Sequence, residues 1–283
     1  ISYATLADYN TNMAIATGGG AMVKAAYSSG KPAYGVGPGN VQCLIDRDVD
    51  YAEAVAKIIT GRCFDNGIIC SGEQSVIAPA EDLDQILTLF KDQGGWVAET
   101  EEDKAKLRAT IFEAGMTAKD VVGQSVADIA RLADLPIPEG TRVILAKADG
   151  PGKADALSKE KMCPVLAVYG YQTFDEALAI AQTNLELEGK GHSAALHSDN
   201  DAHIKQAGLA LTVSRLVVNQ PSSTSAGGSL YNGFAPTTTL GCGTWGNNII
   251  SENFTYKHMI NISRIGYFMK DKPVPTDEEI WAE

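Results

Sequence analysis

The sequence predicts an α/β protein built on a mostly parallel β-sheet. Along the chain, short apolar runs of strand length alternate with amphipathic windows of helix length, which is the pattern of strand–helix–strand units. The chain has 283 residues, of which 45% are hydrophobic and 20% charged. This composition is typical of a globular protein and argues against a disordered, collagen-like or coiled-coil chain. At this length we expect one large domain or two smaller ones.

The N-terminal region combines a helical pattern with a glycine run. The chain begins with Ile1 and enters a helical pattern over residues 6–10 without a preceding cap, so we expect a fragment or a processed chain. Thr17 and a run of three glycines over residues 18–20 then lead directly into a helical run over residues 21–26. Backbone N–H groups at such a helix start can face a phosphate or a ribose, although a tight turn would use the same glycines.

The next segment predicts the first buried strand and its helix. Residues 35–40 contain three glycines, which allow close approach of a ligand or another backbone, and packing alone also explains them. An apolar strand is expected over residues 41–45. Asp48 or Asp50 can cap the following helix, which ends at Gly61. Its apolar face consists of Tyr51, Ala54, Val55, Ile58 and Ile59.

The second half of the chain continues the alternation. The acidic, alanine-rich stretch 100–134 reads as a linker or as a surface excursion. Further strands are expected over residues 142–147, 165–169, 193–197 and 215–219, and further helices over residues 174–185 and 201–211. A capping box at residues 173–176 opens the first of these helices. The Ser- and Gly-rich loop 220–233 is either a functional or a flexible surface loop.

The charge balance limits the partners of the chain. With 23 basic and 35 acidic residues, the net charge of −12 opposes binding to nucleic acid or to anionic lipid. No run of roughly 18 apolar residues predicts a membrane span, and residues 1–10 lack the pattern of a signal peptide. We therefore expect a cytoplasmic protein.

The cysteines provide one candidate nucleophile. Five scattered cysteines do not form a disulfide framework or a C-x-x-C zinc motif, and the four histidines are not spaced as metal ligands. Cys70 lies in a loop between Gly67 and Gly72, where its sulfur can be accessible and backbone N–H groups can stabilise a thiolate or an oxyanion. Cys43, inside an apolar strand, is instead expected to be a core residue.

Several motifs in this order resemble the CoA-acylating aldehyde dehydrogenases. They occupy residues 16–19, 22–33, 64–70, 73–76, 240–246 and 251–253 and so extend over almost the whole chain. The resemblance implies an aldehyde dehydrogenase-like fold in which the parallel-sheet domain is catalytic and is accompanied by the remnant of a Rossmann-like cofactor domain. Residues 1–40 would be the end of the NAD(P)-binding domain and residues 41–240 the catalytic domain. Residues 241–283 would return to the cofactor domain and the oligomer interface.

The resemblance also implies a mechanism. Cys70 would attack the aldehyde, hydride would pass to NAD or NADP, and coenzyme A would release the thioacyl group as an acyl-CoA. Thr17, Gly18 and Gly19 would lie beside the cofactor. Glu160 would hold the nicotinamide ribose, although it reads equally as a solvated charge in the run 158–161.

The absence of one carboxylate favours a thiol as the acyl acceptor. Hydrolytic aldehyde dehydrogenases place a general-base glutamate upstream of the nucleophile, where this chain has Val36. Residues 9–45 contain no Asp or Glu, so no carboxylate in this segment can activate water. A thiol needs less help from a base than water does. Asp65 and Glu73 could substitute, but capping a loop is their commoner role.

Four further residues are candidates for contacts with the aldehyde or CoA. His192 is placed for proton transfer or a CoA contact, or is a structural histidine. Asn219, Ser222 and Ser223 match the part of the family that lines the aldehyde pocket, and the hydroxyl-rich loop favours a polar aldehyde. Succinic semialdehyde is the first expected substrate, followed by sulfoacetaldehyde and acetaldehyde.

Two other functions and an assembly follow from the same residues. A cysteine hydrolase would use Cys70 and His192 without a cofactor. A non-catalytic or incomplete fragment would keep the fold for a structural or assembly role. The family resemblance also implies a homodimer or larger homo-oligomer, with residues 256–268 at an interface.

Overall fold

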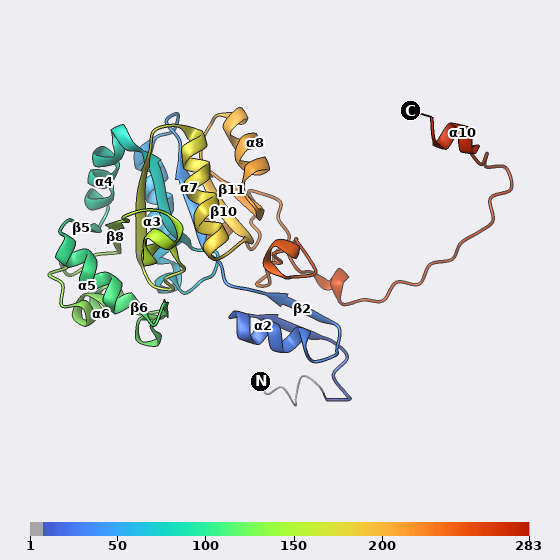
Figure 1. The fold of residues 1–283 in the computed structure, drawn as a ribbon, viewed down its shortest axis with the longest axis horizontal. Helices are drawn as coiled ribbons and strands as arrows, with labels where there is room; N and C mark the ends of the chain where they lie inside the picture. The colour runs from blue at the N-terminus through green and yellow to red at the C-terminus, as the bar shows by residue number, and fades with distance from the viewer. Residues whose placement is uncertain (1–7, 283) are drawn as a thin grey trace.

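The computed structural model describes residues 8–282 as a parallel α/β body, a smaller N-terminal unit and an extended C-terminal segment (Figure 1). In the N-terminal unit, β1 (Ala14–Thr17) and β2 (Ala33–Val36) pair in parallel and are joined by α2 (Gly20–Tyr27). The predicted glycine run therefore lies at a strand-to-helix turn.

The helical pattern expected over residues 6–10 falls partly outside the described residues, which begin at Asp8. In the described part, Tyr9 and Asn10 form a turn, and the Thr11 N–H closes it by donating to the Asp8 carbonyl oxygen. The Asn10 N–H also donates to the Asp8 carboxylate, which stabilises a turn in place of a helix.

The body is a seven-stranded sheet with the order β11-β10-β3-β4-β9-β8-β5, and every neighbouring pair is parallel. Its strands are β3 (Val41–Ile45), β4 (Glu73–Pro79), β5 (Gly95–Ala98), β8 (Val143–Lys147), β9 (Val165–Tyr171), β10 (Gly191–His197) and β11 (Val213–Val218). The predicted parallel sheet is thus confirmed. The chain starts the sheet near its middle, proceeds to one edge and returns, and then adds two strands on the other side of β3.

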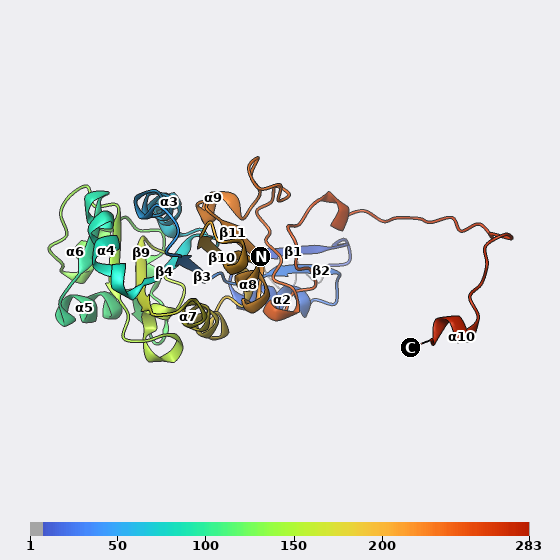
Figure 2. The same ribbon diagram turned by 90° about the horizontal axis from the view of Figure 1, so that it is seen from above.

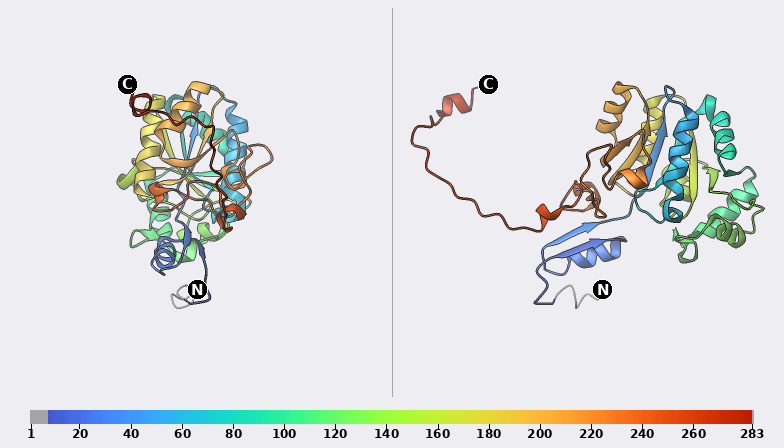
Figure 3. Two further views of the ribbon diagram at one scale, coloured as in Figure 1. Left: turned by 90° about the vertical axis from the view of Figure 1, so that its right-hand side faces the viewer. Right: turned by 180° about the vertical axis from the view of Figure 1, so that it is seen from behind.

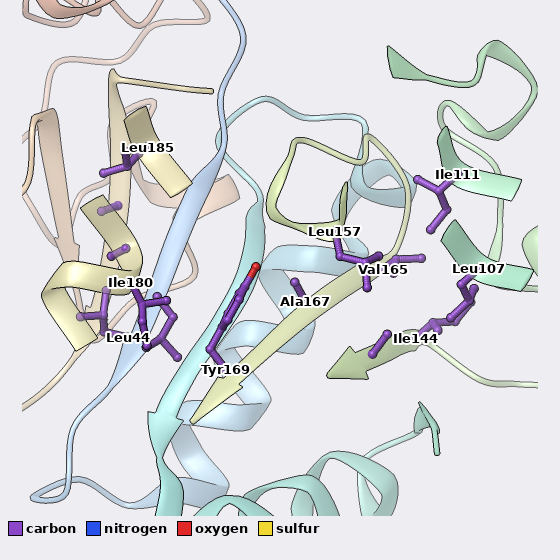
Figure 4. Close-up of a cluster of buried hydrophobic side chains, with 14 of the residues drawn as sticks. Leu44, Leu107, Ile111, Ile144, Leu157, Val165, Ala167, Tyr169, Ile180 and Leu185 are labelled. Atoms are coloured by element: carbon purple, nitrogen blue, oxygen red, sulfur yellow. The ribbon is translucent and has the colours of Figure 1, made fainter. Parts of the chain in front are cut away.

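Helices cover both faces of this sheet, as the left-hand view of Figure 3 shows with α3 in blue and α7 in yellow on opposite sides. One apolar layer joins β3 to α3 (Tyr51–Cys63) and α4 (Leu83–Asp92). The other joins the sheet to α5 (Glu101–Ile111), α6 (Val126–Ala133), α7 (Phe174–Leu187) and α8 (Asp201–Ala210). Figure 4 shows this second layer, in which Leu44 of β3 lies beside Ile180 of α7.

Short elements connect these layers. They are β6 (Phe112–Glu113), which pairs antiparallel with β7 (Met116–Thr117), α9 (Ser222–Ser225), α10 (Asp277–Ile280) and seven 3-10 turns among the described residues. The turns are η1 (Phe64–Gly67), η2 (Ala80–Asp82), η3 (Lys119–Val121), η4 (Gly152–Ala154), η5 (Ala156–Ser158), η6 (Thr244–Gly246) and η7 (Tyr256–His258).

Local capping explains where the predicted helices begin. The Asp50 side chain accepts hydrogen bonds from the N–H groups of Ala52 and Glu53, so Asp50 and not Asp48 caps α3. The Thr173 hydroxyl caps α7 by accepting from the Glu176 N–H. The second half of the predicted capping box differs from the prediction. The Glu176 carboxylate accepts from the N–H of Gln172, one residue before the cap, and not from that of Thr173.

The stretch 100–134 is a surface excursion that packs on the sheet. Leu107, Ile111 and Ile129 are fully buried in the apolar layer that also contains Ile144 of β8. A linker between two domains would not bury these side chains, so the linker interpretation is wrong and the alternative is confirmed.

The C-terminal segment leaves the body after η7, and α10 lies far from the sheet (Figure 2). All residues from 259 to 282 are exposed, including Ile265, Tyr267 and Phe268. Within residues 8–282, no helix combines the length and the apolar character that a membrane crossing requires.

Candidate active site

Cys70 lies at the amino-terminal edge of the sheet, in the loop between α3 and β4. Asp65 and Asn66 adopt left-handed backbone conformations in η1, with φ of 47° and 49°, and turn the chain toward Cys70. Cys70 is partly buried and packs against an apolar cluster of Val217, Ala226 and Leu240. Cys43 is fully buried in β3, as predicted for a core residue.

Burial and neighbouring charges determine the acidity of the Cys70 thiol. Burial raises its pKa to about 12, and the nearby carboxylate of Glu160 acts in the same direction. The guanidinium of Arg215 lowers the pKa, but by less than burial raises it. The thiol is therefore protonated at neutral pH in this arrangement, and nucleophilic attack requires removal of its proton.

Gly39 joins Cys70 to Glu160. Its N–H donates to Oε1 of Glu160 at 3.2 Å, and a Cβ on Gly39 would overlap the carbonyl oxygen of Cys70. The glycines of residues 35–40 thus include one that close backbone approach requires.

Glu160 is buried beside this contact. Only 8% of the residue is exposed, so the solvated-charge interpretation is wrong. Burial raises the pKa of Glu160 to about 8, and the neighbouring carboxylate of Glu188 raises it further. The Glu188 carboxylate accepts a hydrogen bond from the Glu160 N–H at 2.9 Å. Glu160 therefore changes its charge near neutral pH, close to the Cys70 sulfur.

The strand-to-helix turn of the N-terminal unit is linked to the same edge. The hydroxyl of Thr17 lies 3.0 Å from that of Thr239, and the next residue, Leu240, belongs to the cluster that Cys70 contacts. A Cβ on Gly19 would meet no atom within 4 Å, so this turn is open to a ligand. Gly18 has a φ of 155° and donates its N–H to the Val36 carbonyl oxygen. A place for Thr17, Gly18 and Gly19 beside a cofactor stays a prediction.

The hydroxyl-rich loop approaches the nucleophile loop through α9. The Ser222 N–H donates to Oε1 of Glu73 at 2.6 Å, and the Ser71 hydroxyl donates to the Ser223 carbonyl oxygen at 3.4 Å. The hydroxyl oxygens of Ser222 and Ser223 are buried and have no hydrogen-bond partner among the described residues. Two unpaired hydroxyls therefore lie beside the cysteine loop.

The structure does not bring Asn219 to Cys70. Asn219 follows β11 at the carboxyl-terminal edge of the sheet, where its side chain bonds to the backbone of Ser198 and to Asp199. Because Cys70 precedes β4, these two residues lie at opposite edges of a parallel sheet. The structure therefore does not place Asn219 beside Cys70, and its role in lining the aldehyde pocket stays a prediction.

His192 is the second residue of β10 and lies at the same edge of the sheet as Cys70. Its side chain is fully buried. Its Nδ1 lies 3.1 Å from the Ser193 hydroxyl, and its Nε2 has no partner among the described residues. Burial lowers its pKa to about 3, and Arg215 acts in the same direction, so the ring is neutral at physiological pH. A role in proton transfer or CoA binding stays a prediction.

Arg215 is a site residue that sequence reasoning missed. Its buried guanidinium donates to the Ser193 hydroxyl, the Asn253 side chain and the carbonyl oxygens of His192 and Gly241. All four acceptors are neutral, so its positive charge is not cancelled by a carboxylate. The signal that could have found it is an arginine directly before the apolar run Leu216–Val218 of a strand.

Within residues 8–282, no group of His, Cys, Asp or Glu side chains is arranged to hold a metal ion. The fold and the site define an α/β protein that combines a cysteine at the edge of a parallel sheet with a glycine-rich strand-to-helix turn suited to a nucleotide. No protein-family model matches the chain. Individual relatives do match it.

The chain is 58% identical to the succinate-semialdehyde dehydrogenase (acetylating) of Clostridium kluyveri, over 96% of this chain and 60% of that protein. Among solved structures, the acetylating aldehyde dehydrogenase of Geobacillus thermoglucosidasius is 36% identical with a TM-score of 0.91, over 96% of this chain and 60% of that one. A Rhodopseudomonas palustris propionaldehyde dehydrogenase with bound CoA and an acylated cysteine is 25% identical, with a TM-score of 0.77, over 87% of this chain and 55% of that one.

The chain is a homologue of the acylating aldehyde dehydrogenases, and the resemblance read from its motifs is confirmed. The aldehyde dehydrogenase-like fold is confirmed as well. The chain spans about 60% of the length of the first relatives that it matches.

Proposed function

We propose that this chain forms the nucleophile-bearing part of a CoA-acylating aldehyde dehydrogenase. The reaction converts an aldehyde, NAD or NADP, and CoA to an acyl-CoA and NADH or NADPH. The observation that supports it most is the contact of Cys70 with Gly39 and, through Gly39, with Glu160, in a chain 58% identical to an acylating enzyme. The bound cofactor supplies the hydride acceptor.

In this proposal, Cys70 is the catalytic residue. Its thiolate forms a C–S bond to the aldehyde carbon, the carbon loses hydride and becomes a thioester, and the CoA thiolate then displaces the Cys70 sulfur. Cys70 loses its proton before the attack and is regenerated as a thiolate when CoA displaces it, so the net proton of each turnover comes from the CoA thiol. Arg215 favours the thiolate electrostatically, and the backbone N–H groups near Cys70 are available to the carbonyl oxygen.

The cofactor would be held from two sides. Thr17, Gly18 and Gly19 offer an open strand-to-helix turn, and the Glu160 carboxylate, fixed by the Gly39 N–H, would hold the nicotinamide ribose. Residues 1–40 would complete a cofactor-binding domain, residues 41–240 the catalytic domain, and residues 241–283 a segment that returns to the cofactor domain. Phe254 and His258 support the last assignment, since both pack against the Tyr34 ring of β2.

An aldehyde with a distal acid group fits the hydroxyl-rich loop. The buried hydroxyls of Ser222 and Ser223 lack partners, and an unpaired buried donor costs free energy that a ligand carboxylate would recover. The name of the Clostridium kluyveri relative supports succinic semialdehyde as the first substrate to test.

A spectrophotometric assay of the intact protein tests the proposal. NADH absorbance is followed with NAD and succinic semialdehyde, with and without CoA, in the wild type and in Cys70→Ala. Sustained signal that requires both CoA and Cys70 is expected. Cys63→Ala is the matched control, because Cys63 is also partly buried but bonds to the Arg142 carbonyl oxygen. Activity that survives Cys70→Ala, or silence of the wild type with NAD and with NADP, would contradict the proposal.

A further inference from the structure

Glu73 is a wholly buried carboxylate three residues after Cys70. It is the first residue of β4, and none of its surface is exposed. Its carboxylate occupies the space above Gly61 of α3, where a Cβ would overlap both carboxylate oxygens. The helix thus carries a glycine at the position that the Glu73 side chain fills.

The carboxylate connects two segments that are distant in the sequence. Oε1 of Glu73 accepts from the Ser222 N–H at 2.6 Å, across a separation of 149 residues. The Ser71 hydroxyl makes a second contact to the same element through the Ser223 carbonyl oxygen. Both contacts attach α9 to the chain directly after Cys70.

A buried cation lies beneath the same loop without pairing with Glu73. The Arg62 guanidinium is fully buried and donates to the Cys163 carbonyl oxygen, and no ion pair joins it to Glu73. A Cβ on Gly67 would lie 3.1 Å from its Cζ, and one on Gly72 would lie 3.6 Å from its Nη1. The guanidinium therefore lies close to the loop residues that precede Cys70 and to those that follow it.

The buried charges of Glu73 and Arg62 lower the stability of the fold, so stability does not explain their presence. Oε2 of Glu73 and two guanidinium nitrogens of Arg62 have no hydrogen-bond partner in the described structure. Burial also raises the pKa of Glu73 to about 7, as expected for a charge removed from water. An apolar residue would fill the space at lower cost, so the hydrogen bond to the Ser222 N–H is the feature that needs an acceptor oxygen at this position.

We propose that Glu73 is a positioning residue, whose hydrogen bond to the Ser222 N–H holds the hydroxyls of Ser222 and Ser223 over the Cys70 loop, where the aldehyde binds. This inference rests on the proposed function of Cys70. Glu73 acts through α9 and does not itself touch the reacting atoms.

Two substitutions test the hydrogen bond to the Ser222 N–H. Glu73→Gln keeps an oxygen that can accept from the Ser222 N–H, whereas Glu73→Ala removes it. In the intact protein, we expect Glu73→Ala to speed amide exchange at Ser222 by about tenfold or more, as loss of a hydrogen bond to a charged group predicts. kcat/KM for the aldehyde, per titrated Cys70, should fall by a similar factor, while KM for NAD stays unchanged. Glu73→Gln should restore both within about threefold.

Asp46→Ala is the matched control. Asp46 is also a buried carboxylate, but it accepts from Ser198 and contacts His203 at the opposite edge of the sheet. We expect this variant to lower Tm and to leave Ser222 exchange and kcat/KM per active site unchanged.

Two outcomes would overturn the inference. One is unchanged Ser222 exchange in Glu73→Ala, and the other is faster exchange with kcat/KM unaffected or with no rescue by glutamine. If the wild type lacks acyl transfer, the proposed function fails by itself. Ser222 exchange and the alkylation rate of Cys70 by iodoacetamide then still decide whether Glu73 holds α9 and positions the loop.

Discussion

At the scale of single residues, the Glu160 carboxylate raises the pKa of the Cys70 thiol, second only to burial. Because the pKa of Glu160 is raised to about 8, its carboxylate is mostly ionised at pH 9 and disfavours the neighbouring thiolate. We expect Glu160→Gln to lower the pKa of Cys70 and to speed its alkylation by iodoacetamide severalfold at pH 9. The gain should shrink below pH 8, where wild-type Glu160 takes up its proton.

Mass spectrometry of the Cys70 peptide measures this rate, with fully buried Cys43 as the internal reference. Equal rates for Glu160→Gln and wild type across pH 7–9 would show that the carboxylate does not act on the sulfur. A Cys70 that reacts no faster than Cys43 would contradict its assignment as the nucleophile.

Gly39 is the second residue-scale test, because its neighbour Gly37 provides the control. A Cβ on Gly39 would overlap the Cys70 carbonyl oxygen, whereas a Cβ on Gly37 would meet no atom within 4 Å. Overpacking of this kind costs about 1–3 kcal/mol. We expect Gly39→Ala to lower Tm by several degrees and to reduce the Cys70 alkylation rate, and Gly37→Ala to change neither. Calorimetry and alkylation check both, and equal Tm values would refute the close contact.

At the scale of elements, two helical glycines can be compared, one with a crowded and one with an open position for a Cβ. Gly61 in α3 is packed against the Glu73 carboxylate, while Gly208 in α8 is exposed and has free space for a Cβ. Alanine lowers the entropy of the unfolded chain and favours a helix by about 0.5–1 kcal/mol. We expect Gly208→Ala to raise the free energy of unfolding by this amount and Gly61→Ala to lower it. Urea unfolding measures both, and a stabilising Gly61→Ala would contradict the packing described.

Elements that depend on local signals could be predicted from the sequence. The strand β3 matches its predicted bounds, and α3 has its predicted cap and apolar face, because capping and periodicity depend on nearby residues. The helix runs to Cys63, two residues past the predicted end, since Gly61 accommodates Glu73 instead of ending the helix. That contact joins residues of different elements, and no local pattern contains it.

In the candidate site, too, local signals could be predicted from the sequence, and contacts between distant segments could not. Cys70 could be singled out from its loop context and the family resemblance. The place of Asn219 in the aldehyde pocket was an implication of the family resemblance, whereas its contacts to Ser198 and Asp199 join two loops that no local pattern links. Arg215 and the contact between Glu73 and Ser222 depend on strand order and on a loop that returns across the sheet.

At the scale of the whole molecule, the extended C-terminal segment offers an apolar surface for association between subunits. Ile265 is 81% exposed there, in a run that also exposes Tyr267 and Phe268, and such a surface is typical of an interface between subunits. We expect a homo-oligomer by light scattering, and Ile265→Asp should shift it toward the monomer. Leu209→Asp is the control, because Leu209 is 90% exposed on α8, away from this segment. A monomeric wild type would contradict the proposed interface.

The position of β3 in the sheet has a consequence for how the chain is made on the ribosome. One edge of β3 pairs with β4 soon after synthesis, but the other edge pairs with β10, which is translated roughly 150 residues later. At typical elongation rates, an apolar strand edge therefore stays open for about 10–30 s. During this interval nascent chains on neighbouring ribosomes can pair through it. Slower translation between residues 45 and 191 should lengthen this interval and lower the soluble yield, without any change to the finished fold.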